Sequence, residues 1–282
     1  MSFNISTDTT SNLASLILKK YNITAIPLTY IVNGEEKQCT DLSDFDGQKY
    51  YEQIKFSEVK TSTANVAQYL EAWTPILEAG NDILHIAISS GISSAYNAGC
   101  LAADQLREDF PGRKIFVFDS LAASLGEGLQ VIYAAKLREQ GKSIREILDA
   151  LVKRRSHTIQ VFSVDDLNFL KKGGRISTAA AFIGSALHIK PILTSNYCGE
   201  IIVDKKVQGR RSALQALADT FAANFDKKSD GPVGIAYAGC EDDANFLVAL
   251  LKKIAPKAEF LLTQYEPVTG SHVGPGTVAL FY

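Results

Sequence analysis

Cysteines are few in this sequence, and their spacing argues against two classes of protein. The four of them lie far apart and form no CxxC pair: Cys39, Cys100, Cys198 and Cys240. Structural zinc sites and the disulfide frameworks of small secreted domains both require closely spaced cysteines. The four histidines also lack the spacing of metal ligands, so we expect no bound metal. Unpaired cysteines fit a reducing, cytoplasmic location.

Long apolar runs and an excess of one charge are also missing. No run reaches the roughly 18 apolar residues of a membrane-spanning helix, and the N-terminus lacks the basic-then-apolar pattern of a secretory signal. The formal net charge of -2 gives no general attraction to nucleic acid, so we expect no nucleic-acid partner. One local basic cluster can dock an acidic partner or make transient contact with a membrane: Lys205, Lys206, Arg210 and Arg211.

The sequence has no nucleotide-binding fingerprint. It contains no P-loop, and the segment Gly126-Glu127-Gly128 lacks the third glycine of a dinucleotide-binding turn. This segment also lies in a predicted helix, where such a turn does not occur. We therefore expect no nucleotide cofactor.

The chain does contain a regular alternation of strand-like and helix-like segments. Its 282 residues, 46% of them apolar, suffice for one large or two medium domains. In the first half, apolar runs such as residues 83–88 alternate with helical patterns, which predicts a mostly parallel sheet flanked by helices. Paired strands at 191–194 and 201–204 predict a mixed sheet with helices in the second half. We expect two α/β domains, residues 1–157 and 158–282.

Three local patterns give more specific expectations. Residues 24–32 are apolar and β-branched and predict one strand, which Asn33-Gly34 turns into a hairpin. Asp44 is predicted to cap a helix that continues to about residue 56. The glycine- and proline-rich segment 270–277 is predicted to be a loop.

Hydroxyl groups gather at two predicted helix starts. Thr61 begins a Thr-Ser-Thr-Ala-Asn segment ahead of one helix, and residues 89–96 carry four serines ahead of another. Hydroxyl groups here can simply cap a helix, but backbone N–H groups at such a position also favour an anion. The second cluster follows a predicted parallel strand, and ligands of parallel sheets bind beyond the strands' carboxyl ends, where Asp8 and Asp119 also lie.

A glycine pair places one arginine ahead of an apolar stretch. Gly173-Gly174-Arg175 precedes residues 179–187, which predict a helix that is apolar nearly all round. Arginine is costly to bury alone and prefers a carboxylate or phosphate partner. His272 can also donate to an anion or change charge. A fixed cation beside an apolar wall suits an anionic amphiphile; the alternative is an ordinary buried helix with a surface arginine.

A serine esterase is the main alternative function. The segment Gly91-Ile92-Ser93-Ser94-Ala95 nearly matches the G-x-S-x-G nucleophile motif, although the last glycine is missing. Ser93 would be the nucleophile, and His272 would be its base. A regulatory or structural protein with a sealed core is a further alternative.

Taken together, these motifs resemble the DegV family, the fatty-acid-binding B subunits of bacterial fatty acid kinase. Residues 7–13 are similar to the family's opening TDSTADL, and residues 89–96 are similar to its SSGLSGTY loop. Residues 169–177 are similar to YLKKGGRIS, and residues 272–276 match HxGPG. The family's TSQPS motif is altered at residues 61–65, where its proline is missing.

The resemblance implies a cytoplasmic carrier, not itself an enzyme, that holds a long-chain fatty acid between two α/β domains. The carboxylate would be bound by residues matching Thr61 and Ser93, with Arg175 and His272 nearby. The ligand-binding residues that we expect on this basis are Thr61, Ser62, Ser93, Ser94, Arg175, Phe182 and His272. A partner fatty acid kinase would convert the bound carboxyl group to an acyl phosphate for phospholipid metabolism, and the basic cluster would dock this kinase or touch a membrane.

Overall fold

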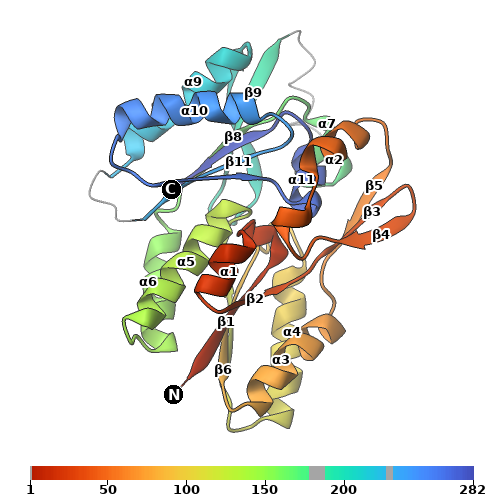
Figure 1. Cartoon of the computed structure of the whole chain (residues 1–282), viewed down its shortest axis with the longest axis vertical. Coiled ribbons are helices and arrows are strands. Elements are labelled where there is room, and N and C mark those ends of the chain that lie inside the picture. The colour runs from red at the N-terminus through yellow and green to blue at the C-terminus, as the bar shows by residue number, and fades with distance from the viewer. Residues whose placement is uncertain (1, 178–187, 227–230) are drawn as a thin grey trace.

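The computed structural model describes residues 2–177, 188–226 and 231–282. These residues form a four-stranded parallel sheet, a six-stranded mixed sheet and a small three-stranded antiparallel sheet (Figure 1). The two larger sheets lie in separate halves of the molecule, and helices cover their outer faces. None of the helices in the described ranges is long and apolar enough to span a bilayer.

The parallel sheet has the strand order β2-β1-β6-β7, and all of its strands come from the first half of the chain. These strands are β1 (Phe3–Asp8), β2 (Ile23–Ile26), β6 (Asp82–Ala87) and β7 (Ile115–Asp119). Every residue of β6 is buried, as its apolar run predicts for a strand that is covered on both faces. One face is covered by α3 (Val66–Glu78) and α4 (Ala95–Asp109), and the other by α5 (Leu125–Glu139). Two further helices pack at the edges of this half: α1 (Ser15–Lys20) against β2 and α6 (Ile144–Arg155) against α5.

The mixed sheet is built from the second half, in the order β10-β9-β8-β13-β11-β12. Its strands are β8 (Gln160–Ser163), β9 (Ile189–Ser195), β10 (Ile201–Gln208), β11 (Val233–Tyr237), β12 (Phe260–Gln264) and β13 (Val278–Phe281). The β11–β12 pair is parallel, and the other pairs are antiparallel. Its outer face packs on α9 (Arg210–Asn224) and α10 (Glu241–Ile254). The predicted parallel and mixed sheets are thus both confirmed.

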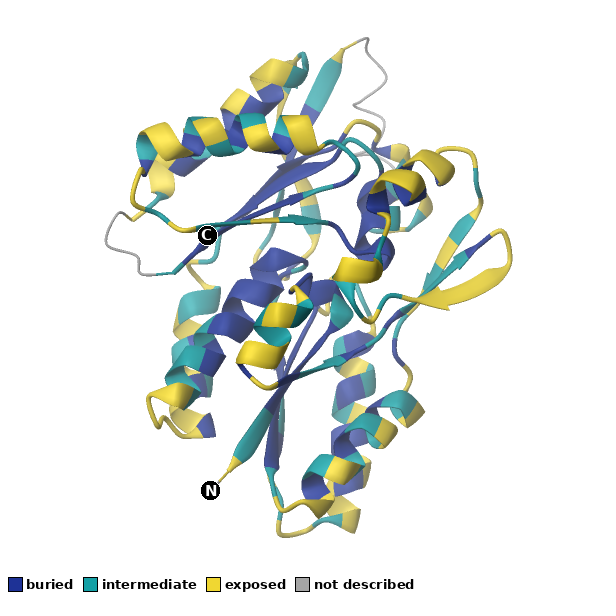
Figure 2. Ribbon diagram, viewed as in Figure 1, coloured by how far each residue is buried: buried dark blue, intermediate teal, exposed yellow. Residues whose placement is uncertain are grey.

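Helix α5 connects the two halves of the molecule. It contacts β1 and β6 of the parallel sheet and also β11 and β13 of the mixed sheet. Ten of its residues are consequently buried, and Figure 2 shows the helix as mostly dark blue. A helix that is buried on more than one side has no clean polar face, which explains its weak amphipathic pattern.

The small sheet lies beside the second half, although it comes from the first. It contains β3 (Thr29–Val32), β4 (Glu35–Gln38) and β5 (Val59–Ser62), and the Asn33-Gly34 hairpin between β3 and β4 is confirmed. Both β3 and β5 contact α11 (Pro267–Val273), which packs in turn on α7 (Asn168–Lys172). Helix α2 (Gly47–Gln53) fixes this arrangement, because the Tyr51 hydroxyl donates to the Tyr265 carbonyl at 2.8 Å.

Two of the predicted elements in the first half have different bounds. The strand predicted over residues 24–32 is two strands, β2 and β3, which separate at Pro27. Proline has no N–H for a sheet ladder, so the chain leaves the parallel sheet there. The helix predicted from Asp44 begins only at Gly47. Its cap is Asp46, whose Oδ1 accepts from the Lys49 N–H at 3.1 Å, while Asp44 ends a short 3₁₀ turn.

The prediction of a loop over residues 270–277 is wrong at its start. Gly270 and His272 belong to α11, whose first turn is capped by the Glu266 carboxylate. A Cβ atom at Gly270 would lie 1.8 Å from the Tyr51 hydroxyl oxygen, so close packing explains a glycine inside this helix. The apolar helix predicted over residues 179–187 lies outside the described residues.

Candidate functional site

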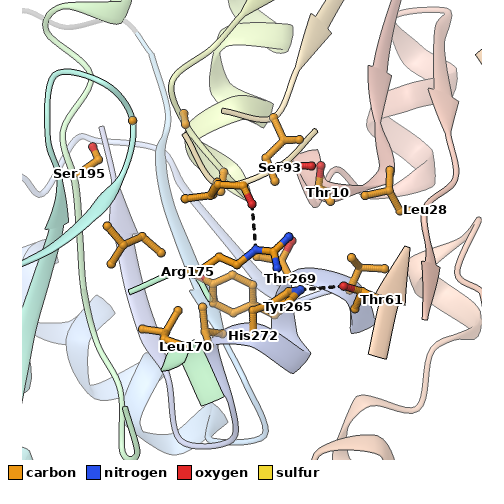
Figure 3. Close-up of a pocket in the computed structure, with 18 of the residues that line it drawn as sticks. Thr10, Leu28, Thr61, Ser93, Leu170, Arg175, Ser195, Tyr265, Thr269 and His272 are labelled. Carbon is orange, nitrogen blue, oxygen red and sulfur yellow. Dashed lines mark hydrogen bonds between the residues drawn. The ribbon is translucent and has the colours of Figure 1, made fainter. Parts of the chain in front are cut away.

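An apolar cavity lies between the two larger sheets. Its walls come from both halves of the chain and include Leu28, Ile88, Phe162, Leu170, Tyr265 and Phe281 (Figure 3). The empty space is about 810 Å³ with the open mouth included, of which about 70 Å³ is wide enough for the centre of a water molecule. The cavity is therefore narrow, and it suits a slender apolar ligand.

Polar side chains from three segments meet at one end of this cavity. Thr61 comes from β5 and His272 from α11, and Thr61 Oγ1 lies 2.8 Å from His272 Nε2 (Figure 3). Burial, with a smaller effect of the Arg175 charge, lowers the pKa of His272 to about 4. The imidazole is therefore neutral at pH 7, and it forms a hydrogen bond with the Thr61 hydroxyl group.

The two glycines of the Gly173-Gly174-Arg175 segment have different roles. Gly173 follows the last residue of α7 and gives the His272 ring room: a Cβ atom on Gly173 would lie 2.2 Å from His272 Nδ1. Gly174 has a φ of +72°, in the left-handed region that favours glycine, and it turns the chain sharply after the helix. The turn directs Arg175 back toward the cavity.

Arg175 lies on the same side of the cavity as Thr61 and His272 (Figure 3). Its Nε donates to the Ile92 carbonyl at 2.8 Å, and its guanidinium group also donates to the Gly173 carbonyl. Among the described residues, no carboxylate forms an ion pair with it. Partial burial lowers the pKa of Arg175, but a guanidinium group stays protonated in proteins. The cavity end therefore has a fixed positive charge.

The serine loop before α4 contributes one hydroxyl group to the cavity. Ser93 lines the cavity, and its Oγ accepts from the Ala95 N–H at 3.2 Å, which leaves its own proton free to donate. Ser62 also lines the cavity. Ser94 does not: it is exposed, and its Oγ lies 3.3 Å from Thr63 Oγ1. The structure thus places Ser94 outside the cavity wall, because consecutive residues at a helix start point in different directions.

The other two serines of this loop make structural contacts, Ser89 with the second half of the chain and Ser90 with the end of β7 in the first half. Ser89 Oγ donates to the Gly199 carbonyl at 3.0 Å, in the turn between β9 and β10. Ser90 bonds to Asp119 through its N–H and its hydroxyl group. Phe182, the remaining predicted ligand-binding residue, lies outside the described residues.

Among the described residues, Ser93 and His272 do not form the hydrogen-bonded nucleophile–base pair of a serine esterase. A serine nucleophile needs a base within hydrogen-bond reach, and that base needs a third group that orients it. His272 Nε2 pairs with Thr61, and the described residues offer no hydrogen bond between Ser93 and His272. The lowered pKa of His272 also makes the ring a poor base near neutral pH.

A buried acidic network beneath the cavity was not predicted from the sequence. Thr10 lines the cavity and donates to Glu127 Oε2 at 3.1 Å, and Asp8 accepts from the Ile88 N–H at 3.1 Å. Both carboxyl groups are fully buried, and burial raises the pKa of Asp8 to about 6 and that of Glu127 well above its usual value. The position of Asp8 at a strand end was a usable signal, but nothing local marked Glu127 as its neighbour.

Comparisons with known proteins agree with this architecture. A sequence profile described as "Uncharacterised protein, DegV family" matches residues 2–282. A DegV domain-containing protein of Clostridium perfringens is 33% identical, over 99% of this chain and 97% of its own length. Another from Lactococcus lactis is also 33% identical, over 100% of this chain and 97% of its own length.

Solved structures with the same fold include three of bacterial DegV proteins. A DegV family protein from Thermus thermophilus, described as binding fatty acid, has 29% identity and a TM-score of 0.88, over 100% of this chain and 99% of its own. A DegV lipid binding protein from Thermotoga maritima has 27% identity and a TM-score of 0.88, with 100% and 98% covered. DegV of Bacillus subtilis, described as a fatty acid binding protein, has 26% identity and a TM-score of 0.87, also with 100% and 98% covered. This chain therefore belongs to the DegV family.

Proposed function

We propose that this protein binds one long-chain fatty acid, with the acyl tail in the apolar cavity and the carboxylate at its polar end. The observation that carries the proposal is the meeting of a fixed cation and several hydroxyl groups at one end of a narrow apolar cavity. The fatty-acid-binding descriptions of DegV proteins from Thermus thermophilus and Bacillus subtilis support it.

The two ends of the ligand have different physical requirements. Each buried methylene group contributes roughly 0.8 kcal/mol, so the tail provides most of the affinity. A carboxylate cannot be buried without partners. Ser93 has a free hydroxyl proton, Thr61 and His272 supply a hydroxyl group and an imidazole, and Arg175 balances the charge. These polar groups thereby determine the orientation of the bound ligand more than they increase its affinity.

We further propose that a separate fatty acid kinase acts on the bound ligand. In that step a carboxylate oxygen attacks the γ-phosphoryl group of ATP, the acyl phosphate forms and ADP leaves. The chain has no nucleotide-binding motif of its own, which fits the role of a carrier subunit. Charge reversal at Lys205 and Lys206, the exposed lysines of the basic cluster, tests whether the kinase docks there. Arg210 is left unchanged, because it forms an ion pair with Asp243.

Fatty-acid binding is tested by a matched pair of variants. Ser93→Ala should weaken oleate binding several-fold in calorimetry, because it removes a donor in the cavity wall. Ser94→Ala, one residue further along, should leave the affinity within twofold of the wild type.

Native mass spectrometry of the purified protein should also show one co-purifying lipid. If no lipid co-purifies and oleate neither binds nor raises the melting temperature, the proposal fails; covalent labelling of Ser93 by a serine-hydrolase probe would instead favour the esterase.

The carrier role is tested with a fatty acid kinase catalytic subunit, ATP and oleate. The acyl phosphate is trapped with hydroxylamine and measured as the hydroxamate. Product should require this protein, and its yield should fall in Ser93→Ala. An equal yield without this protein would contradict the carrier role while leaving fatty-acid binding intact.

A further inference from the structure

The mixed sheet carries a polar pair on the face that it turns toward the apolar cavity. Gln160 begins β8 and Ser195 ends β9, and both side chains line the cavity. Their neighbours on the adjacent strands are apolar and line it too: Ile201 of β10 pairs with Ser195, and Phe281 of β13 pairs with Gln160. Because cross-strand partners lie on the same face of a sheet, these side chains form one row. The middle of this row is polar, although a plain acyl tail needs only apolar neighbours.

Two backbone groups fix the orientation of the Gln160 amide. Its Oε1 accepts from the Ala123 N–H at 3.2 Å, and its Nε2 donates to the Leu121 carbonyl at 2.9 Å. The reversed amide would set a donor against a donor and an acceptor against an acceptor. Nε2 carries two protons, and the second one is donated to Ser195 Oγ at 3.0 Å. Ser195 is therefore the acceptor in this pair.

Ser195 consequently keeps its own hydroxyl proton to donate. No acceptor within residues 2–177, 188–226 and 231–282 takes this proton. A hydrocarbon tail beside it would offer no acceptor and would shield it from water, which costs affinity. An oxygen atom on the tail would accept the proton, and Gln160 Oε1 has a second lone pair that can accept a proton in return. The pair therefore matches a hydroxyl group, which both accepts and donates.

This pair lies away from the residues that we propose to bind the carboxylate. Figure 3 shows Ser195 on the opposite side of the drawn region from Thr61, and well apart from Ser93. With its carboxylate at the polar end of the cavity, a ligand would bring a later part of its tail to Ser195, rather than the carbons next to the carboxyl group.

We propose that Ser195 and Gln160 recognise a hydroxyl group on the acyl tail, so that the protein binds hydroxy fatty acids as well as unsubstituted ones. The proposal rests on the proposed fatty-acid binding and extends it to the chemistry of the tail. Ser195 donates to the hydroxyl oxygen of the ligand, and Gln160 Oε1 accepts the hydroxyl proton. The carboxylate is bound in the same way in both kinds of ligand.

The test compares ligands of equal length by calorimetry. Octadecanoate is the unsubstituted ligand, and 8-, 12- and 16-hydroxyoctadecanoate place one hydroxyl group at successive positions along the tail. The variant is Ser195→Ala, which removes the donor and leaves the Gln160 amide with both of its backbone partners. The control is Ser94→Ala, which removes an exposed hydroxyl group outside the cavity.

The measured quantity is the affinity for each hydroxy acid relative to octadecanoate. For at least one of the three acids, Ser195→Ala should lower this ratio about tenfold, because the hydroxyl group of the ligand is then buried without its donor. Its affinity for octadecanoate should stay within twofold of the wild type, which also shows that the variant is folded. Ser94→Ala should leave all three ratios unchanged. Ratios that are equally unchanged in Ser195→Ala would overturn the proposal.

The octadecanoate titration distinguishes this proposal from the one on which it rests. If octadecanoate does not bind the wild type, the proposed fatty-acid binding fails. If octadecanoate binds and Ser195→Ala weakens it as much as it weakens every hydroxy acid, fatty-acid binding stands and the hydroxyl site is refuted.

Discussion

The residues around the head-group site depend on one another for their positions. His272 reaches Thr61 because Gly173 leaves space beside the imidazole, and Gly174 then brings Arg175 back toward the same point. In this segment the first glycine thus leaves room for the His272 ring, and the second allows the chain to turn. Each position tolerates a different set of substitutions.

Gly173→Ala is expected to weaken fatty-acid binding several-fold while the protein remains folded. The new methyl group would displace the His272 ring, since the Cβ atom would lie 2.2 Å from Nδ1. Gly112→Ala is the control, because a Cβ atom there meets nothing within 4 Å. Calorimetric titration with oleate measures the effect. Equal affinities in the two variants would show that the position of His272 does not matter for binding.

The buried acidic network predicts a pH dependence of stability. A carboxyl group whose pKa is raised by folding contributes stability that is present below its unfolded pKa and is lost as the pH rises through the folded value. Glu127 has such a raised pKa, and its neighbour Asp8 reaches about 6. Glu127→Gln should therefore gain in unfolding free energy relative to the wild type as the pH rises from 5 to 8.

Urea unfolding at several pH values measures this difference. The control is Glu71→Gln on the exposed side of α3, whose difference from the wild type should stay constant with pH. A constant difference for Glu127→Gln as well would mean that this carboxyl group titrates alike in the folded and unfolded chains.

At the scale of elements, α5 is closely packed on more than one side. It lies between both sheets, and a Cβ atom at Gly128 would lie 2.4 Å from the Ser11 carbonyl oxygen. A backbone oxygen cannot move aside as a side chain can. Gly128→Ala should therefore destabilise the protein by about 1–3 kcal/mol, despite the better helix propensity of alanine.

Gly99→Ala in α4 makes the matched comparison. A Cβ atom there would make ordinary contacts at 3.5–3.6 Å, so the substitution should stabilise the protein by roughly 0.5–1 kcal/mol. Chemical denaturation of both variants tests the pair. Opposite signs are expected, and a stabilising Gly128→Ala would contradict the close approach of α5 to the segment after β1.

Elements were predictable from the sequence where the pattern was local. The apolar run of β6 and the Asn33-Gly34 turn both carry their own signals, and the structure confirms them. The α11 helix was missed because Gly270 is explained only by the distant Tyr51 hydroxyl. In the site, Ser93 was expected in the cavity wall on its motif, whereas the exposure of Ser94 depends on the register of a helix start.

At the scale of the whole molecule, the two halves are interlocked rather than linked side by side. One continuous hydrophobic core includes residues from both, and the small sheet of the first half packs on α11 of the second. We propose that the chain nonetheless divides into two domains, residues 1–157 and 158–282, and that these two domains unfold in one cooperative step. Scanning calorimetry should show one cooperative transition that oleate shifts upward. Two separate transitions would contradict this interlocking.

The hydrogen bond between Thr61 and His272 has a consequence for selectivity. Thr61 and His272 share a hydrogen bond in the structure, so a carboxylate bound here, as we propose, would replace one hydrogen bond with another. Such an exchange yields little net free energy, typically about 1 kcal/mol. Related amphiphiles with different acidic heads should therefore compete on nearly equal terms at this contact. On the proposed function, we therefore expect affinity to vary more with the length and shape of the acyl tail than with the chemistry of the acidic head.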